Sequence, residues 1–361
     1  MGIVVVLNHS KKASDNIKKK NNILFSKLKS HKFLLPLHII RLFEVEDKFA
    51  GVGIARKVGM DAAAFHFYSC DQTDGLIFSL DADTVVGEKY FEKIFDEFYS
   101  NKKISGASIY YEHPMPLNRK IKDAIVQYEL HLRYYVNMLR LVQFPFAFHT
   151  VGSAFVVDYK SYLRQNGMPK KQGGEDFYFL NKVMLEGNYC DICSTSVYPY
   201  GRPTKKTPFG TGMALHSILS SEKKVFYTYH YDSFLQLKKI IDVNVFFEDF
   251  NCEEYVKAYE SVIQDFLKSI DFCKKIELIK KNTSNFNTFK KAFYTWFDGF
   301  KAVKFLNYIH NVGKIERIPV VEAAKIVVGK EMSSYELLNY FRELDKKNQL
   351  CLNSDFELYE K

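Results

Sequence analysis

Residues 75–84 read GLIFSLDADT, and this stretch decides the fold class that we expect for the chain. The uncharged run at residues 75–80 predicts a buried strand, and Asp81 and Asp83 follow where that strand stops. In an open α/β sheet, ligands bind at the carboxyl ends of the strands. Two carboxylates one residue apart in a turn can converge on a hard divalent cation, which would neutralise a diphosphate. Because DxD tripeptides are common by chance, the prediction depends on the position of this one after an apolar strand.

Two further strand patterns and a glycine-rich turn precede this strand. Residues 2–7 form a continuous apolar run that ends in Asn8-His9-Ser10, which predicts a buried strand followed by a polar loop. A lysine-rich helical stretch comes next, and residues 34–42 form a second strand-like run. Residues 51–64, GVGIARKVGMDAAA, are typical of a glycine-rich turn that opens a helix.

The glycine-rich turn carries two cations, Arg56 and Lys57. Glycine backbone and cations together suit a diphosphate, although the spacing differs from that of the dinucleotide-binding fingerprint. The start of an ordinary surface helix explains the same residues, so this segment alone leaves both interpretations open.

A second acidic pair stands at Gly173-Gly174-Glu175-Asp176, where a helical pattern begins. Two glycines allow a ligand to approach the backbone closely. Acidic residues are also favoured at the start of any helix, and this capping role is the alternative explanation. Taken with the upstream aspartates, the pair predicts a metal at one acidic site and a general base at the other.

Strand patterns at residues 104–111 and 154–158 alternate with helical patterns at residues 89–99 and 115–145. This alternation predicts a parallel or mixed α/β sheet. From residue 231 onward the pattern is helical to the end of the chain. We therefore expect an α/β domain over residues 1–230 and a helical C-terminal domain over residues 231–361.

Four segments in order resemble the motifs of the family-2 glycosyltransferases of the GT-A fold, and they cover residues 2–187. They are GIVVVLNHS, GVGIARKVGMDAA, GLIFSLDADT and GGEDFYFL, with 25 positions from Arg56 to Asp81 and 95 from Asp81 to Asp176. The resemblance implies a GT-A-like nucleotide-sugar-binding mixed sheet flanked by helices. It also implies a metal-dependent inverting transferase that moves a sugar from a nucleotide-sugar to a hydroxyl acceptor, in surface polysaccharide or glycan synthesis.

The resemblance implies a metal and nucleotide site. Asp83 would be a direct ligand of Mn²⁺ or Mg²⁺, and Asp81 would face the nucleotide ribose and the metal. The cation would stabilise the departing nucleoside diphosphate as a Lewis acid. Arg56 would lie near the nucleotide, while Arg202 and His216 would close over the diphosphate or complete the metal shell.

The resemblance also implies a catalytic base. Asp176 would deprotonate the acceptor hydroxyl, so that the attack inverts the anomeric carbon. Glu175 would orient the acceptor or support Asp176. The acceptor class that follows from the resemblance is a glycan or a lipid-linked precursor.

The start of the chain departs from the family pattern. Family members have a strand and a P-x-Y-N-E-like loop before the segment that corresponds to residues 2–7, and an acidic loop where this chain has Asn8-His9-Ser10. A truncated start, a separate chain that supplies the strand, and loss of sugar transfer each explain the difference. A sheet without its central strand has two unpaired edges, which invite aggregation or pairing with another chain. We therefore expect this chain, expressed alone, to be poorly soluble, oligomeric or inactive.

Composition and charge narrow the classes of partner. The 361 residues are 47% hydrophobic and carry a formal charge of +9, which favours nucleotides, nucleic acid or an acidic lipid surface as partners. The sequence has no aromatic RNA-binding signature and no zinc-finger spacing, so we expect no nucleic-acid partner. Six scattered cysteines are expected to be free thiols. These features predict a cytoplasmic protein, with peripheral contact at the inner face of the membrane as a further expectation.

Two other functions stay open at this point. One is a non-catalytic glycosyltransferase-like subunit or remnant that acts through nucleotide or protein binding. The other is a nucleotidyltransferase, which also uses paired acids on an α/β sheet. The GGED segment far downstream of the DxD tripeptide favours sugar transfer over nucleotidyl transfer.

Overall fold

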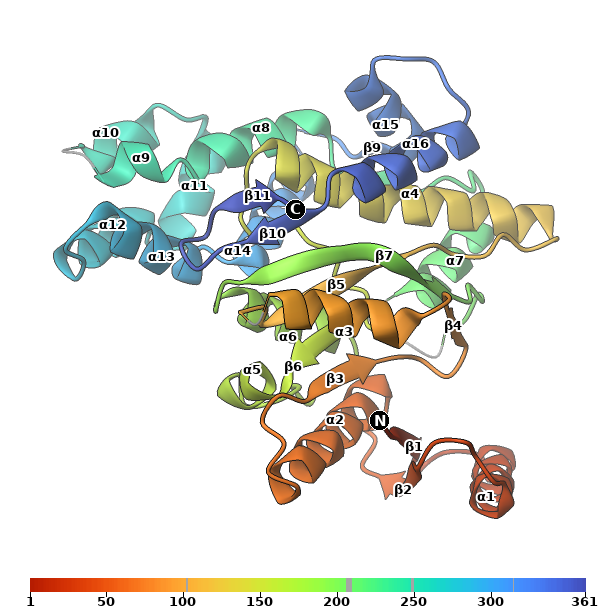
Figure 1. The fold of residues 1–361 in the computed structure, drawn as a ribbon. Helices are drawn as coiled ribbons and strands as arrows, with labels where there is room; N and C mark the ends of the chain where they lie inside the picture. Colours follow the sequence, from red (N-terminus) through yellow and green to blue (C-terminus); the bar gives the residue numbers. More distant parts are fainter. Residues whose placement is uncertain (102, 206–209, 248–249, 314) are drawn as a thin grey trace. The chain divides into compact units, whose positions relative to one another are not determined.

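The computed structural model describes residues 1–101, 103–205, 210–247, 250–313 and 315–361 (Figure 1). These residues form two compact units. Unit 1 comprises Met1–Met115 with Thr150–Ser217, and unit 2 comprises Pro116–His149 with Ile218–Lys361. The predicted α/β class, with a mixed sheet flanked by helices, is confirmed. Within the described ranges, no helix is both long and apolar enough to cross a membrane.

The main sheet of unit 1 is mixed, as its strand directions show. Its strands run in the order β3 (Leu76–Ser79), β6 (Phe155–Asp158), β5 (Gly106–Tyr111) and β7 (Tyr189–Pro199). β6 is antiparallel to both β3 and β5, whereas β5 and β7 are parallel. The short strand β4 (Thr84–Val86) pairs antiparallel with the end of β7. All six residues of β5 are buried, so the core of unit 1 lies around this strand.

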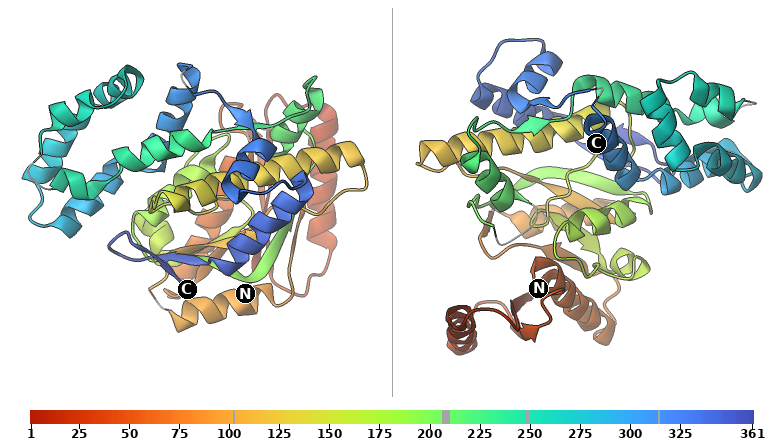
Figure 2. Two further views of the ribbon diagram at one scale, coloured as in Figure 1. Left: turned by 90° about the horizontal axis from the view of Figure 1, so that it is seen from above. Right: turned by 180° about the vertical axis from the view of Figure 1, so that it is seen from behind.

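Helices cover both faces of this sheet (Figures 1 and 2). Phe78 of β3 packs against aromatic rings of α3 (Tyr90–Ser100), while Phe155 of β6 packs against Phe179 of α6 (Glu175–Met184). In the register of the two strands Phe155 lies opposite Ser79, one position from Phe78. Since neighbouring positions in a strand point to opposite faces, α3 and α6 lie on opposite faces. The other helices wholly within unit 1 are α1 (Asp15–Ser30), α2 (Val52–Ser69) and α5 (Tyr159–Arg164), and α7 (Thr211–Ser220) begins in unit 1.

The first two strands form a separate sheet. β1 (Ile3–Ser10) pairs in parallel with β2 (Leu37–Val45), and among the described residues it does not pair with β3. The prediction of a buried strand is wrong, because most of β1 is only partly covered and Ile3 is 40% exposed. The prediction of a polar loop at Asn8-His9-Ser10 is also wrong, since these residues continue the strand. A strand with one neighbour keeps an open edge, and that edge leaves its apolar run half covered.

Unit 2 is built around the long helix α4 (Arg119–Leu141). Three helices of the C-terminal region pack against it, α8 (Tyr231–Ile240), α15 (Val320–Val328) and α16 (Ser334–Lys347). The remaining helices of the unit are α9 (Val243–Phe247), α10 (Cys252–Lys257), α11 (Ser261–Ser269), α12 (Phe272–Lys281), α13 (Phe286–Trp296) and α14 (Gly299–Asn311).

The C-terminal region is not helical to its end, so that part of the prediction is wrong. β9 (Ile318–Pro319) pairs with β8 (Tyr227–Thr228), and β10 (Leu350–Leu352) pairs antiparallel with β11 (Leu358–Glu360). These strands are two or three residues long, which is too short to show a two-residue hydrophobic alternation in the sequence.

Four charged side chains join α4 to α16, and we call them the helix cluster: Glu129, Arg133, Arg342 and Asp345. Arg342 donates to both carboxylate oxygens of Glu129, at 2.8 and 2.9 Å. Arg133 donates to Glu129 at 2.9 and 3.0 Å and to Asp345 at 2.5 Å. None of the four side chains is more than 9% exposed. Because a buried charge is tolerated only when it is paired and hydrogen-bonded, these contacts fix α16 against α4.

Cys252 of α10 and Cys273 of α12 form a disulfide, with 5.5 Å between their Cα atoms. The prediction of free thiols is therefore wrong for this pair, and it is also wrong for Cys190 and Cys351, which are disulfide-bonded as well. Cys252 and Cys273 are 21 positions apart, which is no recognisable motif spacing, and only the packing of the helices brings the sulfurs together. Cys70 is a free thiol.

Candidate functional site

The glycine-rich turn brings the start of α2 against the loop that precedes α6. As predicted, the helix opens directly after Gly51, whose carbonyl accepts a hydrogen bond from the Asn8 side chain at 2.7 Å. A Cβ atom on Gly53 would lie 1.9 Å from the carbonyl oxygen of Lys171. Only glycine allows two backbones to approach so closely. This approach sets the first turns of α2 beside the GGED segment.

Arg56, in the second turn of α2, meets carboxylates from two other elements. Its Nη2 donates to Asp81 Oδ1 at 2.8 Å, and its Nη1 pairs with Glu175 Oε1. The side chains of Arg56 and Glu175 are 7% and 2% exposed, whereas that of Asp81 is 42% exposed. Asp176 lies at the same place, because a Cβ on Gly152 would be 2.8 Å from both Arg56 Nη1 and Asp176 Oδ2. We call Arg56, Asp81, Glu175 and Asp176 the site cluster.

In the part of the chain that the structure describes, the site cluster contains three carboxylates and one guanidinium. Burial would lower the pKa of Arg56, but the charges of Asp81, Glu175 and Asp176 outweigh burial and raise that pKa. Burial raises the pKa of Asp176, and Asp81 raises it further, while Arg56 offsets only part of the effect. The pKa of Glu175 is raised for the same reason. The cluster therefore holds more negative charge than its arginine neutralises.

Neither acid at the start of α6 is the N-cap residue of that helix. The N-cap residue is Gly174, in a left-handed conformation with φ of 67°, and no side chain caps the helix there. The Glu175 carboxylate pairs with Arg56, and Asp176 Oδ1 accepts from the next backbone amide, that of Phe177, at 2.8 Å. Both acids lie in the first turn, where the helix dipole favours negative charge.

Asp83 follows Asp81 in the turn between β3 and β4, and it pairs with Arg202. The side chains of Asp83 and Arg202 are 41% and 65% exposed, so solvent and ligands reach this ion pair. His216 lies on α7 and is half-buried. Within the described ranges, no group of three or more His, Cys, Asp or Glu side chains is arranged to hold a metal, so His216 is not gathered with Asp81 and Asp83.

The donor set at the end of β3 nevertheless suits a divalent cation. Asp81 forms an ion pair with Arg56, and Asp83 forms one with Arg202. Carboxylate oxygens are the ligands that Mg²⁺ and Mn²⁺ prefer, and Mg²⁺ is commonly held by one or two carboxylates together with substrate phosphates. Asp81 and Asp83, each beside a guanidinium, therefore have the chemistry of a cation site that phosphate oxygens would complete.

Sequence reasoning missed Gly152 and Ser79, which lie beside the site cluster. Gly152 approaches Arg56 and Asp176, and its carbonyl accepts a 2.7 Å hydrogen bond from the buried Ser79 hydroxyl at the end of β3. The Gly-Ser pair at residues 152–153 offered a signal, as a small-residue break before a predicted strand. Lys57 does not join the site cluster, because it pairs with Asp61 on α2 at 2.9 Å.

No known family model matches this sequence, and no curated protein matches it.

Proposed function

We propose that this chain is a metal-dependent inverting glycosyltransferase of the GT-A type. It would transfer a sugar from a nucleotide-sugar to a hydroxyl of a glycan or lipid-linked acceptor. One observation carries the proposal: Arg56 joins the aspartate at the end of β3 to the acidic pair that begins α6. An anion-binding guanidinium, a cation-binding carboxylate and a buried base candidate therefore lie within one group of side chains.

Each side chain takes a role that suits its environment. Asp83 and Asp81 would hold Mn²⁺ or Mg²⁺, and the bound cation would supply Lewis-acid stabilisation to the leaving diphosphate. Arg56 and Arg202 pair with phosphate oxygens, for which the planar guanidinium is well suited. Glu175 keeps Arg56 in place through their buried ion pair.

Asp176 is the proposed base. Its carboxylate takes the proton of the acceptor hydroxyl as the acceptor oxygen forms a bond to the anomeric carbon. The bond from that carbon to the phosphate oxygen breaks, and the electron pair leaves with the nucleoside diphosphate. A raised pKa makes the Asp176 carboxylate a stronger base than an exposed aspartate.

The separate sheet of β1 and β2 favours a second candidate function. Because β1 pairs with β2 and not with β3 among the described residues, the nucleotide-binding side of the sheet is interrupted. A chain of this kind could bind a nucleotide and act through a partner without transferring sugar. The two candidates differ in turnover and not in nucleotide binding.

The first test is calorimetry with UDP, GDP, CDP and TDP, each with Mn²⁺ and with a chelator. We expect one nucleotide to bind in the presence of Mn²⁺, and the Asp83→Ala substitution to weaken this binding by about 10–100-fold, the loss typical when support of a metal is removed. Asp96→Ala is the matched control, since Asp96 is an exposed carboxylate on α3. Equal affinity with metal and with chelator would contradict the metal role, and binding without donor turnover would favour the second candidate.

A further inference from the structure

Helix α1 and the loop after it expose large apolar side chains. α1 has no buried residue, and its side chains Ile17, Ile23 and Leu24 are 40–47% exposed. In the loop, Phe33 is 41% exposed and Leu34 is fully exposed. A helix that packs on a two-stranded sheet normally buries its apolar residues. Large exposed apolar side chains on α1 and the loop therefore indicate a surface that binds an apolar partner.

The same surface is strongly basic. Eight lysines and one acidic residue fall between Lys11 and Lys32. Lys12 and Lys18 form ion pairs with Asp47 and Glu44. Four exposed lysines lie on the helix itself, and they are Lys19, Lys20, Lys27 and Lys29.

The lysines and the apolar side chains share one ridge of the helix. Ile17, Lys20, Leu24 and Lys27 are spaced by three and four residues, so they follow one another along one side of α1. Long lysine side chains can lay their methylene stems on apolar material and keep the ammonium group in a polar layer. The ridge is therefore suited to a boundary between a charged layer and an apolar one.

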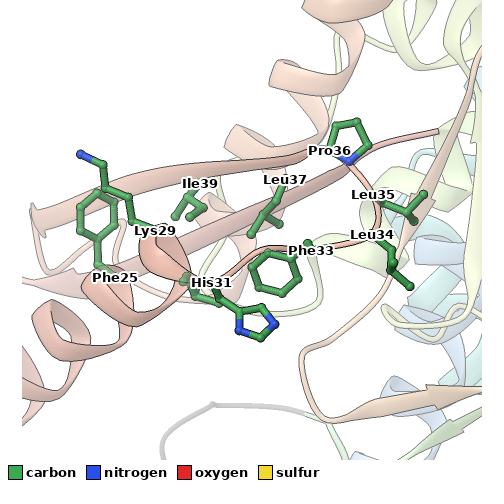
Figure 3. Close-up of a pocket in the computed structure, with 10 residues that line it drawn as sticks. Phe25, Lys29, His31, Phe33, Leu34, Leu35, Pro36, Leu37 and Ile39 are labelled. Carbon is green, nitrogen blue, oxygen red and sulfur yellow. The ribbon is translucent and has the colours of Figure 1, made fainter.

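A hollow of about 610 Å³ opens between the end of α1 and β2 (Figure 3). Phe25 of α1, Phe33 of the loop, and Leu37 and Ile39 of β2 line it. Leu34 lines it as well. The apolar surface is thus continuous from the helix to the loop and into the hollow.

We propose that α1 and the loop at residues 31–36 bind the surface of an anionic lipid bilayer. Phe33 and Leu34 enter the acyl layer, and Lys20 and Lys27 pair with phosphate headgroups. Charge decides against a second copy of this chain, because two such faces would place lysines opposite lysines. The exposed Phe and Leu side chains decide against nucleic acid, whose phosphate backbone offers them no apolar contact. This inference rests on the N-terminal surface alone and does not depend on the proposed transferase activity.

The test is co-sedimentation of the full chain with vesicles of phosphatidylcholine, with and without phosphatidylglycerol, at low and high salt. We expect binding to the anionic vesicles only, weakening as salt rises. A lysine near an anionic surface contributes about fivefold in affinity, so Lys20→Glu with Lys27→Glu should weaken binding by at least about 25-fold. Lys274→Glu with Lys281→Glu is the matched control, with the same spacing on exposed positions of α12.

The apolar part is tested by Phe33→Ser with Leu34→Ser, which should abolish the binding that survives high salt. Phe65→Ser with Leu117→Ser is its control, because these side chains are 70% and 106% exposed elsewhere on the chain. Equal binding to both vesicle types, or unchanged binding by the lysine variant, would overturn the proposal. Two further outcomes would also overturn the proposal. They are binding of the wild-type chain to a DNA duplex, or its self-association, if the same variants abolish that interaction and the wild-type chain does not bind vesicles.

Discussion

The two groups of arginines and carboxylates in this protein use the same chemistry and differ in charge balance and access. The helix cluster sets two carboxylates, Glu129 and Asp345, against Arg133 and Arg342, and its side chains are at most 9% exposed. The site cluster sets three carboxylates against Arg56, and the Asp81 side chain is 42% exposed. In the helix cluster the two carboxylates are balanced by two guanidinium groups. In the site cluster the carboxylates outnumber the guanidinium, and one of them is open to solvent.

Residue type alone therefore does not distinguish a structural ion cluster from a ligand site. The pKa shifts follow the charge balance. Burial would raise the pKa of Asp345, but His149, Arg133 and Arg140 outweigh burial and hold that pKa well below its usual range. The pKa of Asp176 is raised, because its single guanidinium neighbour does not compensate for burial and for Asp81. A perturbed carboxyl pKa with this sign is typical of functional sites.

The largest expected effect is on turnover, from Asp176→Asn. An amide cannot accept the acceptor proton, and general base catalysis contributes about 10²–10⁴-fold. Turnover of the nucleotide-sugar should fall by about that factor, while nucleotide affinity and the fold persist, since Asn can still accept from the Phe177 amide. Initial rates with the donor found by calorimetry give the measurement, and Asp96→Asn is the control. Full activity in Asp176→Asn would move the role of base to another residue, Glu175 first.

The second effect is on stability, from Glu129→Gln in the helix cluster. Glu129 accepts four hydrogen bonds from Arg133 and Arg342, and removing one partner of a buried ion pair costs about 3–5 kcal/mol. Urea unfolding should show a loss of that size with no direct effect on nucleotide binding. In the control Asp355→Asn, which disrupts a half-exposed pair with Lys291, the loss should be about 0.2–1 kcal/mol. A loss below about 1 kcal/mol for Glu129→Gln would show that the buried helix cluster contributes no more than an exposed ion pair.

The smallest effect is a difference in pH dependence, and it has opposite signs in the two clusters. A raised carboxyl pKa contributes stability only at low pH, and that contribution is lost as pH rises through the folded-state pKa. Asp176→Asn should therefore stabilise unit 1 at neutral pH, with the gain shrinking toward the ordinary aspartate pKa of about 3.9. A depressed pKa contributes stability above the ordinary pKa, so Asp345→Asn should destabilise unit 2 at neutral pH, with a loss that shrinks below about 3.9.

Hydrogen exchange of peptides from α6 and α16 between about pH 3 and about pH 8 separates the two responses. The wild-type chain supplies the baseline at each pH. Protection that changes in the same direction in both variants would mean that the charge balance of the clusters does not control their pKa values.

The sequence by itself determined the local elements and the residue types of the candidate site. The apolar run before Asp81 predicted β3, the glycine-rich turn predicted the start of α2, and the acidic pair predicted the start of α6. These predictions succeeded because each depends on a local property: strand-length hydrophobicity, the freedom of glycine backbone, and the preference of acids for a helix start.

Only the tertiary structure decided which of these residues meet. Nothing in the sequence shows that Gly53 packs on the Lys171 carbonyl. Nor does it show that this contact sets Arg56 between two carboxylates, those of Asp81, 25 positions away, and Glu175, 119 positions away. The apolar run at residues 2–7 has the pattern of a buried central strand, yet β1 is half-exposed because burial depends on neighbouring strands that lie far away in the sequence. The charge balance that separates the two clusters is likewise a property of packing, since it depends on which side chains share a site and not on which residues are present.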